Sequence, residues 1–434
     1  MKAAFLTLGC KVNGYETEAV AELFKVRGFE LARPGETADV VVVNTCTVTN
    51  IGDSKSRQTI RGAVRDHPGA AVVVMGCYSQ LQQEKVAAIE GVSVVLGTKD
   101  RHLAPLYVEE YLKTKTPIVR VSPLSVGDGF EGMTIRRFDR HRRAFLKIED
   151  GCDNFCSYCV IPYARGRVRS KDPATVLDEA RRLCENGYHE IVLTGIHTGG
   201  YGKDLDGYRF ADLLDDLAKI EGIERIRISS IEESELTEEV VDAIASNPLF
   251  ANHLHIPLQS GSDKILRAMN RRYLTADYAR KIASLRARIP GLSVTTDVIA
   301  GFPGETEEDF ENSLSFIKRI GFSELHVFPF SRRDGTAAAK LPDDVGAIEK
   351  KRRVQRLLDL SDEMAKAFVR SQVGTCMVAI PEGSADGWLT GHTGNYLRVR
   401  FPGDPSRIGK PVAVRLTGEA YPISPAVMDD PTPA

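Results

Sequence analysis

Residues 151–159 read Gly-Cys-Asp-Asn-Phe-Cys-Ser-Tyr-Cys, a loop in which three cysteines follow the spacing Cys-x3-Cys-x2-Cys. Three thiolates this close in sequence can bind one metal centre from a single loop. A structural zinc site takes four ligands and is closed. A four-iron cluster held by three cysteines keeps one iron open for a small ligand, whereas the usual electron-transfer cluster has four cysteines. The loop therefore predicts a metal centre on Cys152, Cys156 and Cys159, with an incomplete zinc knuckle or unrelated thiols as the alternatives.

The composition is that of an ordinary globular protein without a coat of positive charge. The chain has 434 residues, 42% of them hydrophobic and 27% charged, with a formal net charge of −2. This length suits about two to four domains, and the charge balance still allows a local basic patch for RNA. No apolar run approaches the roughly 20 residues that span a bilayer, and residues 1–9 are too short in their apolar part for a signal peptide. Eight cysteines without an export signal favour metal binding over disulfides, so we expect a cytoplasmic protein with no membrane partner.

Residues 1–115 alternate apolar, Val-rich runs with segments of helical spacing. Continuous apolar strands between helices are typical of a parallel sheet that is covered on both faces. This region is therefore predicted to be a doubly wound α/β domain. The predicted strands are 3–8, 40–43, 72–75 and 92–96, and the predicted helices are 16–27, 55–65, a segment from about 80, and 103–112.

Three further cysteines, Cys10, Cys46 and Cys77, each come just after the end of a predicted strand of this domain. Parallel strands place their carboxyl ends at the same edge of the sheet, where the loops form the ligand crevice of such folds. The three thiols are therefore predicted to converge on one point and to hold a second metal centre with three protein ligands. The alternative is that small buried cysteines simply suit strand ends.

A segment rich in turn residues, 116–143, follows this domain and is predicted to be a linker. It ends in a basic cluster, for which two interpretations stay open: a phosphate-contacting strip beside the active site, or a solvated linker that discourages aggregation. The cluster comprises Arg136, Arg137, Arg140, His141, Arg142 and Arg143.

Residues 144–370 resume the alternation of strands and helices and end in a long amphipathic helix over 345–370. Six such units predict a partial (β/α)6 barrel, smaller than the eight-stranded form. Its chemistry is expected at the carboxyl ends of the strands, where the loop 151–159 also lies. The predicted strands are 144–148, 190–193, 225–228, 253–257, 293–299 and 325–328.

Residues 371–434 change to short strands that are separated by turn pairs, the pattern of a small antiparallel β-barrel. Its aromatic and basic residues are candidates for RNA binding, although the domain could also serve only to pack against the barrel. The proline-rich tail after Tyr421 is predicted to be loose. The candidate RNA contacts here are Tyr396, Arg398, Arg400 and Lys410, and those in the linker are Arg136, Arg137, Arg142 and Arg143.

Three groups of motifs resemble one family. The loop 151–159, with Tyr158 before its last cysteine, resembles the cluster loop of the radical S-adenosylmethionine (SAM) enzymes. The stretches Thr-Leu-Gly-Cys-Lys-Val-Asn at 7–13, Asn-Thr-Cys-Thr-Val-Thr at 44–49 and Gly-Cys-Tyr at 76–78 resemble the three-cysteine domain of the radical SAM methylthiotransferases. Gly-His-Thr-Gly-Asn-Tyr and Gly-Lys-Pro-Val, which begin at 391 and 409, resemble the RNA-binding TRAM domain. The resemblance covers nearly the whole chain.

The resemblance implies a transferase with SAM and two [4Fe-4S] clusters as cofactors. Cys152, Cys156 and Cys159 would hold the cluster that binds SAM, and Cys10, Cys46 and Cys77 an auxiliary cluster that delivers a methylated sulfur. The stretch 301–304 resembles the glycine-rich segment that radical SAM barrels place against adenine, although such a turn alone is a weak signal. The candidate SAM contacts are Tyr158, Thr194, Gly195, Ser229, Glu232, Gln259, Gly301 and Pro303.

The opening stretch 9–13 and the stretch 195–202 resemble the bacterial branch of the family that modifies threonylcarbamoyladenosine at position 37 of tRNA. The expected partners are the tRNA anticodon loop and an electron donor such as flavodoxin or ferredoxin, whereas the sulfur donor is not predicted. The alternatives are the branches that modify isopentenyladenosine-37 of tRNA or an aspartate of a ribosomal protein. A rival from another class is a non-catalytic iron–sulfur redox sensor that binds RNA.

Overall fold

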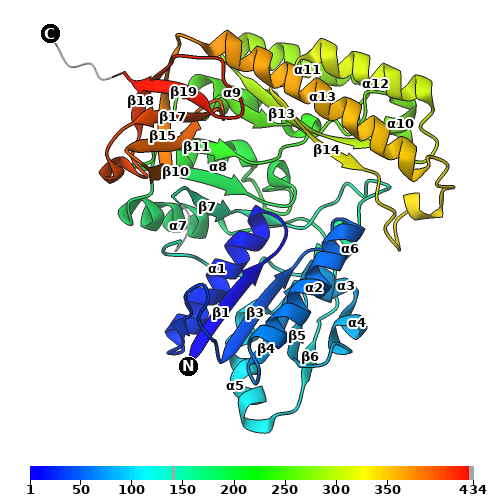
Figure 1. The fold of residues 1–434 in the computed structure, drawn as a ribbon, viewed down its shortest axis with the longest axis vertical. Coiled ribbons are helices and arrows are strands. Elements are labelled where there is room, and N and C mark those ends of the chain that lie inside the picture. Colours follow the sequence, from blue (N-terminus) through cyan, green and yellow to red (C-terminus); the bar gives the residue numbers. More distant parts are fainter. Residues whose placement is uncertain (139–141, 430–434) are drawn as a thin grey trace. The chain divides into compact units, whose positions relative to one another are not determined.

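The structure is a computed structural model that describes residues 1–138 and 142–429. The chain forms two compact units, whose elements can be followed in Figure 1. The first unit comprises Met1–Asp139, Lys147–Asp172 and Ser331–Ala339, and the second comprises Arg140–Leu146, Pro173–Phe330 and Lys340–Ala434. Two segments that the sequence assigns to the barrel therefore group with the N-terminal sheet, and one of them contains the loop 151–159.

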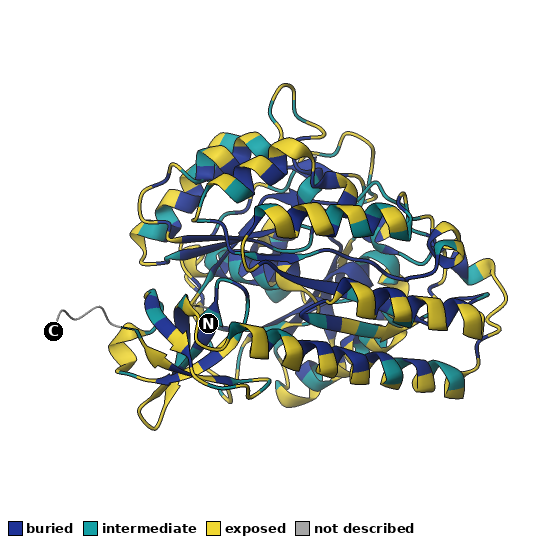
Figure 2. Ribbon diagram, turned by 90° about the horizontal axis from the view of Figure 1, so that it is seen from above, coloured by how far each residue is buried: buried dark blue, intermediate teal, exposed yellow. Residues whose placement is uncertain are grey.

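The first unit is built on a parallel sheet of six strands in the order β2-β1-β3-β4-β5-β6. Its central strands are Val-rich and completely buried, as in a parallel sheet covered on both faces. Figure 2 shows the burial of the whole chain by colour, with exposed residues along the outer sides of the helices. The predicted doubly wound domain is confirmed. Two of the strands escaped prediction because they are only two or three residues long. The strands are β1 (Lys2–Thr7), β2 (Glu30–Leu31), β3 (Val40–Thr45), β4 (Ala71–Gly76), β5 (Val92–Leu96) and β6 (Ile118–Arg120).

Three helices of this sheet begin within a few residues of the carboxyl end of a strand. The first helix starts immediately after Cys10, and the second starts at Asn50, where the Thr49 hydroxyl caps it by accepting from the Gly52 N–H at 3.1 Å. The helices are α1 (Lys11–Val26), α2 (Asn50–Asp66), α3 (Cys77–Leu81), α4 (Gln83–Ala87), the short 3-10 turn η1 (Arg101–Leu103) and α5 (Ala104–Thr114).

The loop 151–159 lies in a segment whose two ends are joined by a short antiparallel pair of strands. The segment starts at β8 (Glu149–Asp150) and ends at β9 (Arg169–Ser170). Between them lie the three cysteines and the short helix α6 (Ile161–Arg165). The ladder anchors both ends of the loop, which fixes the position of its cysteines within the first unit.

The second unit contains the predicted partial barrel. Its strands form two parallel three-stranded sheets, β11-β10-β7 and β12-β13-β14, which single bridges such as Ser230 to His255 connect. The strands are β7 (Ala144–Lys147), β10 (Glu190–Thr194), β11 (Arg225–Ile228), β12 (His253–His255), β13 (Ser293–Ala300) and β14 (Glu324–Pro329). The helices are α7 (Pro173–Glu185), α8 (Phe210–Leu217), α9 (Glu238–Ser246), α10 (Asp263–Ala268), α11 (Thr275–Arg288), α12 (Glu307–Ile320) and α13 (Ala347–Gln372).

A closed five-stranded barrel, β15-β16-β17-β19-β18, ends the second unit around a core that includes Val399 and Phe401. The prediction that the chain is loose after Tyr421 is wrong for 424–428, because this segment closes the barrel as β19. It pairs antiparallel with β18 and parallel with β17, so the barrel is not antiparallel throughout. Residues 430–434 lie outside the described residues. The strands are β15 (Cys376–Ala385), β16 (Trp388–Thr393), β17 (Arg398–Pro402), β18 (Val412–Leu416) and β19 (Ser424–Met428).

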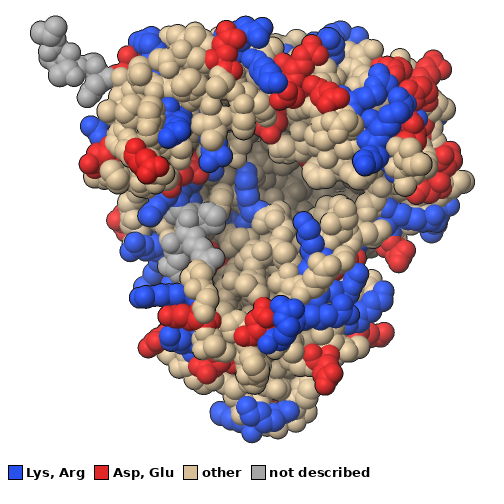
Figure 3. Space-filling model, viewed as in Figure 1, with Lys and Arg blue, Asp and Glu red and all other residues tan. Residues whose placement is uncertain are grey.

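The mixed charge of the surface and the polarity of the helices agree with the predictions from the composition. Figure 3 shows Lys and Arg side chains interspersed with Asp and Glu over the face in view. Within the residues that the structure describes, no helix is long and apolar enough to cross a membrane.

Candidate metal centres

The structure brings Cys10, Cys46 and Cys77 to the same edge of the first sheet. Cys10 directly precedes α1, Cys46 follows β3, and Cys77 opens α3 after β4. Burial raises the pKa of the Cys46 thiol, and the nearby Cys10 raises it further. Burial also raises the pKa of Cys77, to about 11, with contributions from Cys10 and Cys46. These three thiols, the N-terminal triad, are therefore close enough to repel one another as thiolates.

The second set of thiols, Cys152, Cys156 and Cys159, forms the loop triad. Burial raises the pKa of Cys152, and Cys159 and Cys156 add to the rise, while the Asn154 N–H donates to the Cys152 sulfur at 3.5 Å. A tight turn holds the other two cysteines together, because the Cys159 N–H donates to the Cys156 carbonyl at 2.9 Å. All three cysteines of the loop triad are partly buried.

Glycines make the close approach of these loops sterically feasible at two positions. Gly76 precedes Cys77 with a φ of 106°, and a Cβ there would lie 2.5 Å from the Asn44 Oδ1. Gly151 precedes Cys152 with a φ of 90°, and a Cβ there would lie 1.9 Å from the Arg167 carbonyl oxygen. A side chain at either position would displace backbone or buried groups that position a cysteine.

Arg165 connects the two triads within the first unit. It ends the helix that follows the loop triad, yet its Nε donates to the Cys77 sulfur at 3.2 Å. The same guanidinium donates to the Asn13 Oδ1 at 2.8 Å, and the Asn13 amide in turn donates to the carbonyl of Thr45, the residue before Cys46. Arg165 is fully buried, so its contact places a permanent positive charge beside the N-terminal triad.

A buried ion network compensates the charge of Arg165. Its Nη1 lies 2.7 Å from Glu16 and 3.0 Å from Asp150, and Lys147 lies 2.7 Å from both carboxylates. Burial raises the pKa of Glu16, but Arg101, Arg165 and Lys147 lower it more, so the carboxyl stays ionised. The network joins α1, the strand β8 and α6, three segments far apart in the sequence. Sequence reasoning missed it, although charged residues within the apolar strand 144–150 were a usable signal.

Both triads fit an iron–sulfur cluster. Each offers three soft sulfur ligands, and each buries thiols whose deprotonation is unfavourable without a compensating cation. A bound metal centre removes this conflict, because the thiolate becomes the favoured form on coordination. The N-terminal triad has in addition the Arg165 N–H at a sulfur, a contact that stabilises negative charge on the ligand.

The predicted SAM contacts lie in two places. Tyr158 belongs to the first unit, and the others lie at strand ends of the second, which agrees with a barrel whose strands end in a ligand crevice. Thr194 is buried and Gln259 has a φ of 68°. The Gly301 N–H donates to the Glu305 carboxylate at 2.7 Å, and the Glu232 carboxylate pairs with Arg271. Glu232 is therefore already bound by a cation, and its role as a ribose acceptor stays a prediction.

Three polar residues that sequence reasoning left aside meet on the second sheet of the barrel. Asp297 lies in β13 with its Oδ1 3.3 Å from the Nε2 of His255 and 3.3 Å from the Nδ1 of His326. Burial raises the pKa of Asp297, but hydrogen bonds from the two imidazoles lower it more, so the net pKa falls well below its usual range. Their strand register could have revealed the group, because Asp297 and His326 are direct neighbours in adjacent strands.

The residues predicted to contact RNA differ in how far they are exposed. Arg136, Arg137 and Arg142 are exposed, whereas Arg143 is half-buried, 3.2 Å from Glu382; Arg140 and His141 lie outside the described residues. Arg398, Arg400 and Lys410 are exposed on the small barrel. The Tyr396 ring stacks on His253 at 4.6 Å and on His392 at 4.9 Å between centroids. Tyr396 thus packs within the second unit, and the expectation of a free stacking face there is not met.

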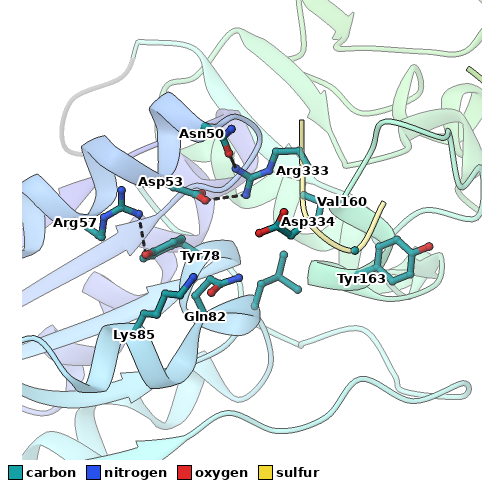
Figure 4. A pocket seen from close by; sticks show the side chains of 12 residues that line it. Asn50, Asp53, Arg57, Tyr78, Gln82, Lys85, Val160, Tyr163, Arg333 and Asp334 are labelled. Atoms are coloured by element: carbon teal, nitrogen blue, oxygen red, sulfur yellow. Dashed lines mark hydrogen bonds and ion pairs between the residues drawn. The ribbon is translucent and has the colours of Figure 1, made fainter. Parts of the chain in front are cut away.

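A polar pocket opens in the first unit, and Figure 4 shows the side chains that line it. Its volume is about 250 Å³. One wall contains Tyr78, which follows Cys77, and another contains Val160, which follows Cys159. The remaining walls come from α2, from α4 and from the turn around Arg333. No sequence motif marked this pocket, because its residues come from four separated segments.

Two family models match the chain. The radical SAM superfamily model matches residues 146–317, which include the loop triad. A model described as uncharacterized protein family UPF0004 matches residues 2–97, which include the N-terminal triad. Together with the partial barrel, these matches define the chain as a radical SAM protein with a second three-cysteine domain.

Curated relatives extend over nearly the whole chain. Over 425 residues it is 48% identical to the threonylcarbamoyladenosine tRNA methylthiotransferase MtaB of Bacillus subtilis, a match covering 96% of this chain and 94% of that protein. Over 424 residues it is 35% identical to the tRNA-2-methylthio-N(6)-dimethylallyladenosine synthase of Carboxydothermus hydrogenoformans, covering 95% and 96% of the two chains. The chain therefore belongs to the radical SAM tRNA methylthiotransferase family. It is a transferase whose cofactors are SAM and iron–sulfur clusters.

Among solved structures, the radical SAM methyltransferase TsrM from Kitasatospora setae, with cobalamin and a [4Fe-4S] cluster bound, matches with a TM-score of 0.58. The match covers 90% of this chain and 77% of that one at 15% sequence identity. At this identity the likeness shows the shared fold alone.

Proposed function

We propose that the protein converts N6-threonylcarbamoyladenosine at position 37 of tRNA to its 2-methylthio derivative. The observation that carries the proposal is the higher identity to the threonylcarbamoyladenosine enzyme, 48%, than to the dimethylallyladenosine enzyme, 35%, over matches of nearly equal length. The arrangement of two three-cysteine sites in one compact unit supports it. The anticodon loop is the proposed binding partner.

The six cysteines form two sites with different proposed roles. Cys152, Cys156 and Cys159 are proposed to hold the cluster that binds SAM, and Cys10, Cys46 and Cys77 the auxiliary cluster. When bound, these groups supply radical chemistry and a sulfur source, which side chains alone do not provide. Three ligands in each triad leave one coordination position for a non-protein ligand.

The chain's own residues position and shield these sites. The Arg165 guanidinium fixes the Cys77 sulfur from the helix that follows the loop triad. Because Arg165, Glu16 and Asp150 are all buried, the network excludes water from the region that joins the triads. Buried ion pairs therefore link the segments that carry the two triads.

Contacts to SAM and RNA complete the proposal. The proposed SAM contact of the first unit is Tyr158, and those of the second unit are Thr194, Gly195, Ser229, Glu232, Gln259, Gly301 and Pro303. The exposed cations Arg136, Arg137, Arg142, Arg398, Arg400 and Lys410 would contact tRNA phosphates, with Arg143 and Tyr396 behind them. The electron donor is proposed to be a flavodoxin or ferredoxin.

The proposal is tested with purified, cluster-loaded protein, SAM, a reductant and two synthetic anticodon stem-loops. One loop carries threonylcarbamoyladenosine at position 37 and the other dimethylallyladenosine. Nucleoside mass spectrometry should find the 2-methylthio product on the first loop. Product on the second loop alone would reassign the branch. Failure to cleave SAM to 5′-deoxyadenosine with both clusters loaded would favour the redox sensor.

A further inference from the structure

The pocket beside the triads is lined by three cations from three different segments. Arg57 comes from α2, Lys85 from α4, and Arg333 from the turn after β14 (Figure 4). Two acids, Asp53 and Asp334, also line it, so one positive charge stays uncompensated. Tyr78 and Tyr163 add aromatic rings to the lining, and of the three cations Arg333 is buried, Arg57 half-buried and Lys85 exposed. A concave, polar site of this kind with a net charge suits a small anionic group.

The three cations differ in how far they are already neutralised. Arg333 is paired with Asp53 at 2.9 Å and donates to Asn50 and Thr47, each at 2.7 Å. Arg57 donates to the Tyr78 hydroxyl at 3.0 Å, a neutral partner. Among the described residues, neither Arg57 nor Lys85 makes an ion pair. The uncompensated charge therefore lies on the side of the pocket formed by α2 and α4.

The position of these two cations relates the pocket to the reaction. Tyr78, the partner of Arg57, directly follows the triad residue Cys77. The second turn of α2 packs on Cys46, since the Ser56 hydroxyl donates to the Cys46 carbonyl at 2.9 Å. Arg57 is the next residue of the same turn, so α2 connects the N-terminal triad to this cation of the pocket.

We propose that Arg57 and Lys85 bind the carboxylate of the amino-acid group on the N6 atom of the substrate adenosine. The proposal rests on the proposed function and deepens it. A threonylcarbamoyl group carries a carboxylate, whereas a dimethylallyl group is apolar. Arginine binds a carboxylate through two parallel N–H donors, and Lys85 supplies a second cation in the lining of the same pocket. Arg57 is thus the residue that selects the amino-acid-modified base.

A backbone phosphate of the tRNA is the competing occupant. Two observations favour the carboxylate. Arg57, which lies beside the buried Tyr78 in the pocket wall, is half-buried, whereas phosphate contacts are typically made by exposed cations. It also holds two acids, which fit a singly charged group in a defined orientation better than a backbone that carries one charge per nucleotide.

The test compares affinities for three anticodon stem-loops that share every phosphate. Position 37 carries threonylcarbamoyladenosine, the same group with its carboxylate converted to a neutral amide, or unmodified adenosine. The wild-type holoenzyme should bind the first loop about 10- to 100-fold more tightly than the amide loop, the range expected for a charge-assisted hydrogen bond. In Arg57→Met this ratio should fall below about 3, and Lys85→Met should lower it partially.

Matched variants separate the proposal from general damage. Arg61→Met removes an exposed cation one turn further along α2, outside the pocket, and should keep the full ratio. Tyr78→Phe removes the hydroxyl partner of Arg57 but keeps the cation, and should keep most of it. Iron and sulfide content per chain verifies that each variant is loaded.

Each outcome decides between the alternatives. A wild-type ratio that persists in Arg57→Met overturns the subsite while leaving the proposed function standing. An equal loss of affinity for all three loops in Arg57→Met assigns Arg57 to a backbone phosphate and overturns the proposal. Methylthiolation of a dimethylallyladenosine loop but not of the threonylcarbamoyl loop by the wild type overturns the proposed function and the subsite together.

Discussion

Arg165 has a fully buried guanidinium with Glu16, Asp150 and the Cys77 sulfur as partners. Replacing it by methionine leaves two buried carboxylates short of a counter-charge, which typically costs about 3–5 kcal/mol. Arg165→Met should therefore lower the free energy of unfolding of the first unit by about this amount, as measured by anaerobic urea denaturation. It should also lower the iron content per chain, because the position of Cys77 is no longer fixed.

Arg167→Gln is the control for this prediction. Arg167 lies two residues further on and pairs with Asp153 at 3.3 Å, but both side chains are exposed. An exposed ion pair contributes about 1 kcal/mol or less, so this variant should unfold and load iron like the wild type. Equal effects of the two substitutions would show that burial of the network does not matter.

Cys10 is the exposed member of the N-terminal triad. Cys10→Ala should abolish the methylthiolated product but keep the cleavage of SAM to 5′-deoxyadenosine, because the loop triad is untouched. Both are measured by mass spectrometry in one reaction, and Cys376→Ala, an exposed cysteine of the small barrel, serves as the control. Normal product from Cys10→Ala would exclude a division of labour between the triads.

At the scale of an element, Asp309 couples the start of α12 to its surroundings. It closes a capping box with Thr306 and accepts from Lys264 at 2.6 Å and Ser262 at 2.8 Å. Burial raises the pKa of Asp309, but these hydrogen bonds lower it more, to about 2 from a usual 3.8. Its stabilisation is therefore complete above pH 3.8 and is lost as the pH falls toward 2.

Asp309→Asn should accordingly be less stable than the wild type at pH 6, by about 1 kcal/mol, a typical value for a helix cap. The difference should vanish near pH 2, where the wild-type carboxyl becomes protonated. Urea denaturation of cluster-free protein at both pH values measures this. A difference that grows toward low pH would contradict the assigned direction of the shift.

The small barrel is joined to the strands of the second unit through Glu190. This buried carboxylate lies 2.8 Å from Arg227 and 3.2 Å from Arg225, and the two guanidiniums donate to the carbonyls of Thr393 at 3.0 Å and Val378 at 2.6 Å. Strands β10 and β11 therefore hold β15 and β16 through charge-assisted hydrogen bonds.

Arg227→Met should release the small barrel, because it breaks a buried network and leaves Glu190 with one cation fewer. We expect cleavage between α13 and β15 by a nonspecific protease to accelerate about tenfold or more, as followed by intact-mass spectrometry. Arg398→Met removes an exposed cation of the same barrel and should not change the rate. Unchanged cleavage in Arg227→Met would mean that apolar contacts alone hold the barrel.

At the scale of the whole molecule, local patterns predicted most strands of the fold. Val-rich runs such as 40–43 predict buried parallel strands. The topology of a parallel sheet then predicts that cysteines just after these strands lie at the same edge. The strand 424–428 was missed because the prolines in and around it suggest a loose tail. Its conformation is determined by pairing with β17 and β18, which closes the five-stranded barrel.

Contacts between segments that are distant in the sequence could not be predicted from the sequence alone. Arg165, Glu16 and Asp150 occupy separate stretches, and nothing local distinguishes a buried ion from a surface one. The pocket around Arg57 combines four segments for the same reason. Tyr396 was expected to face RNA because an aromatic residue in a basic strand is typical of such surfaces, but it stacks on His253 of the same unit.

The central claim is that two three-cysteine sites act together on one modified adenosine. Nucleoside mass spectrometry of tRNA tests it most directly, in cells that lack the gene and carry the wild-type gene, Cys10→Ala or Cys156→Ala. We predict that 2-methylthio-threonylcarbamoyladenosine disappears without the gene, returns with the wild type, and stays absent with either variant while threonylcarbamoyladenosine accumulates. Its persistence without the gene, or its return with either variant, would contradict the account.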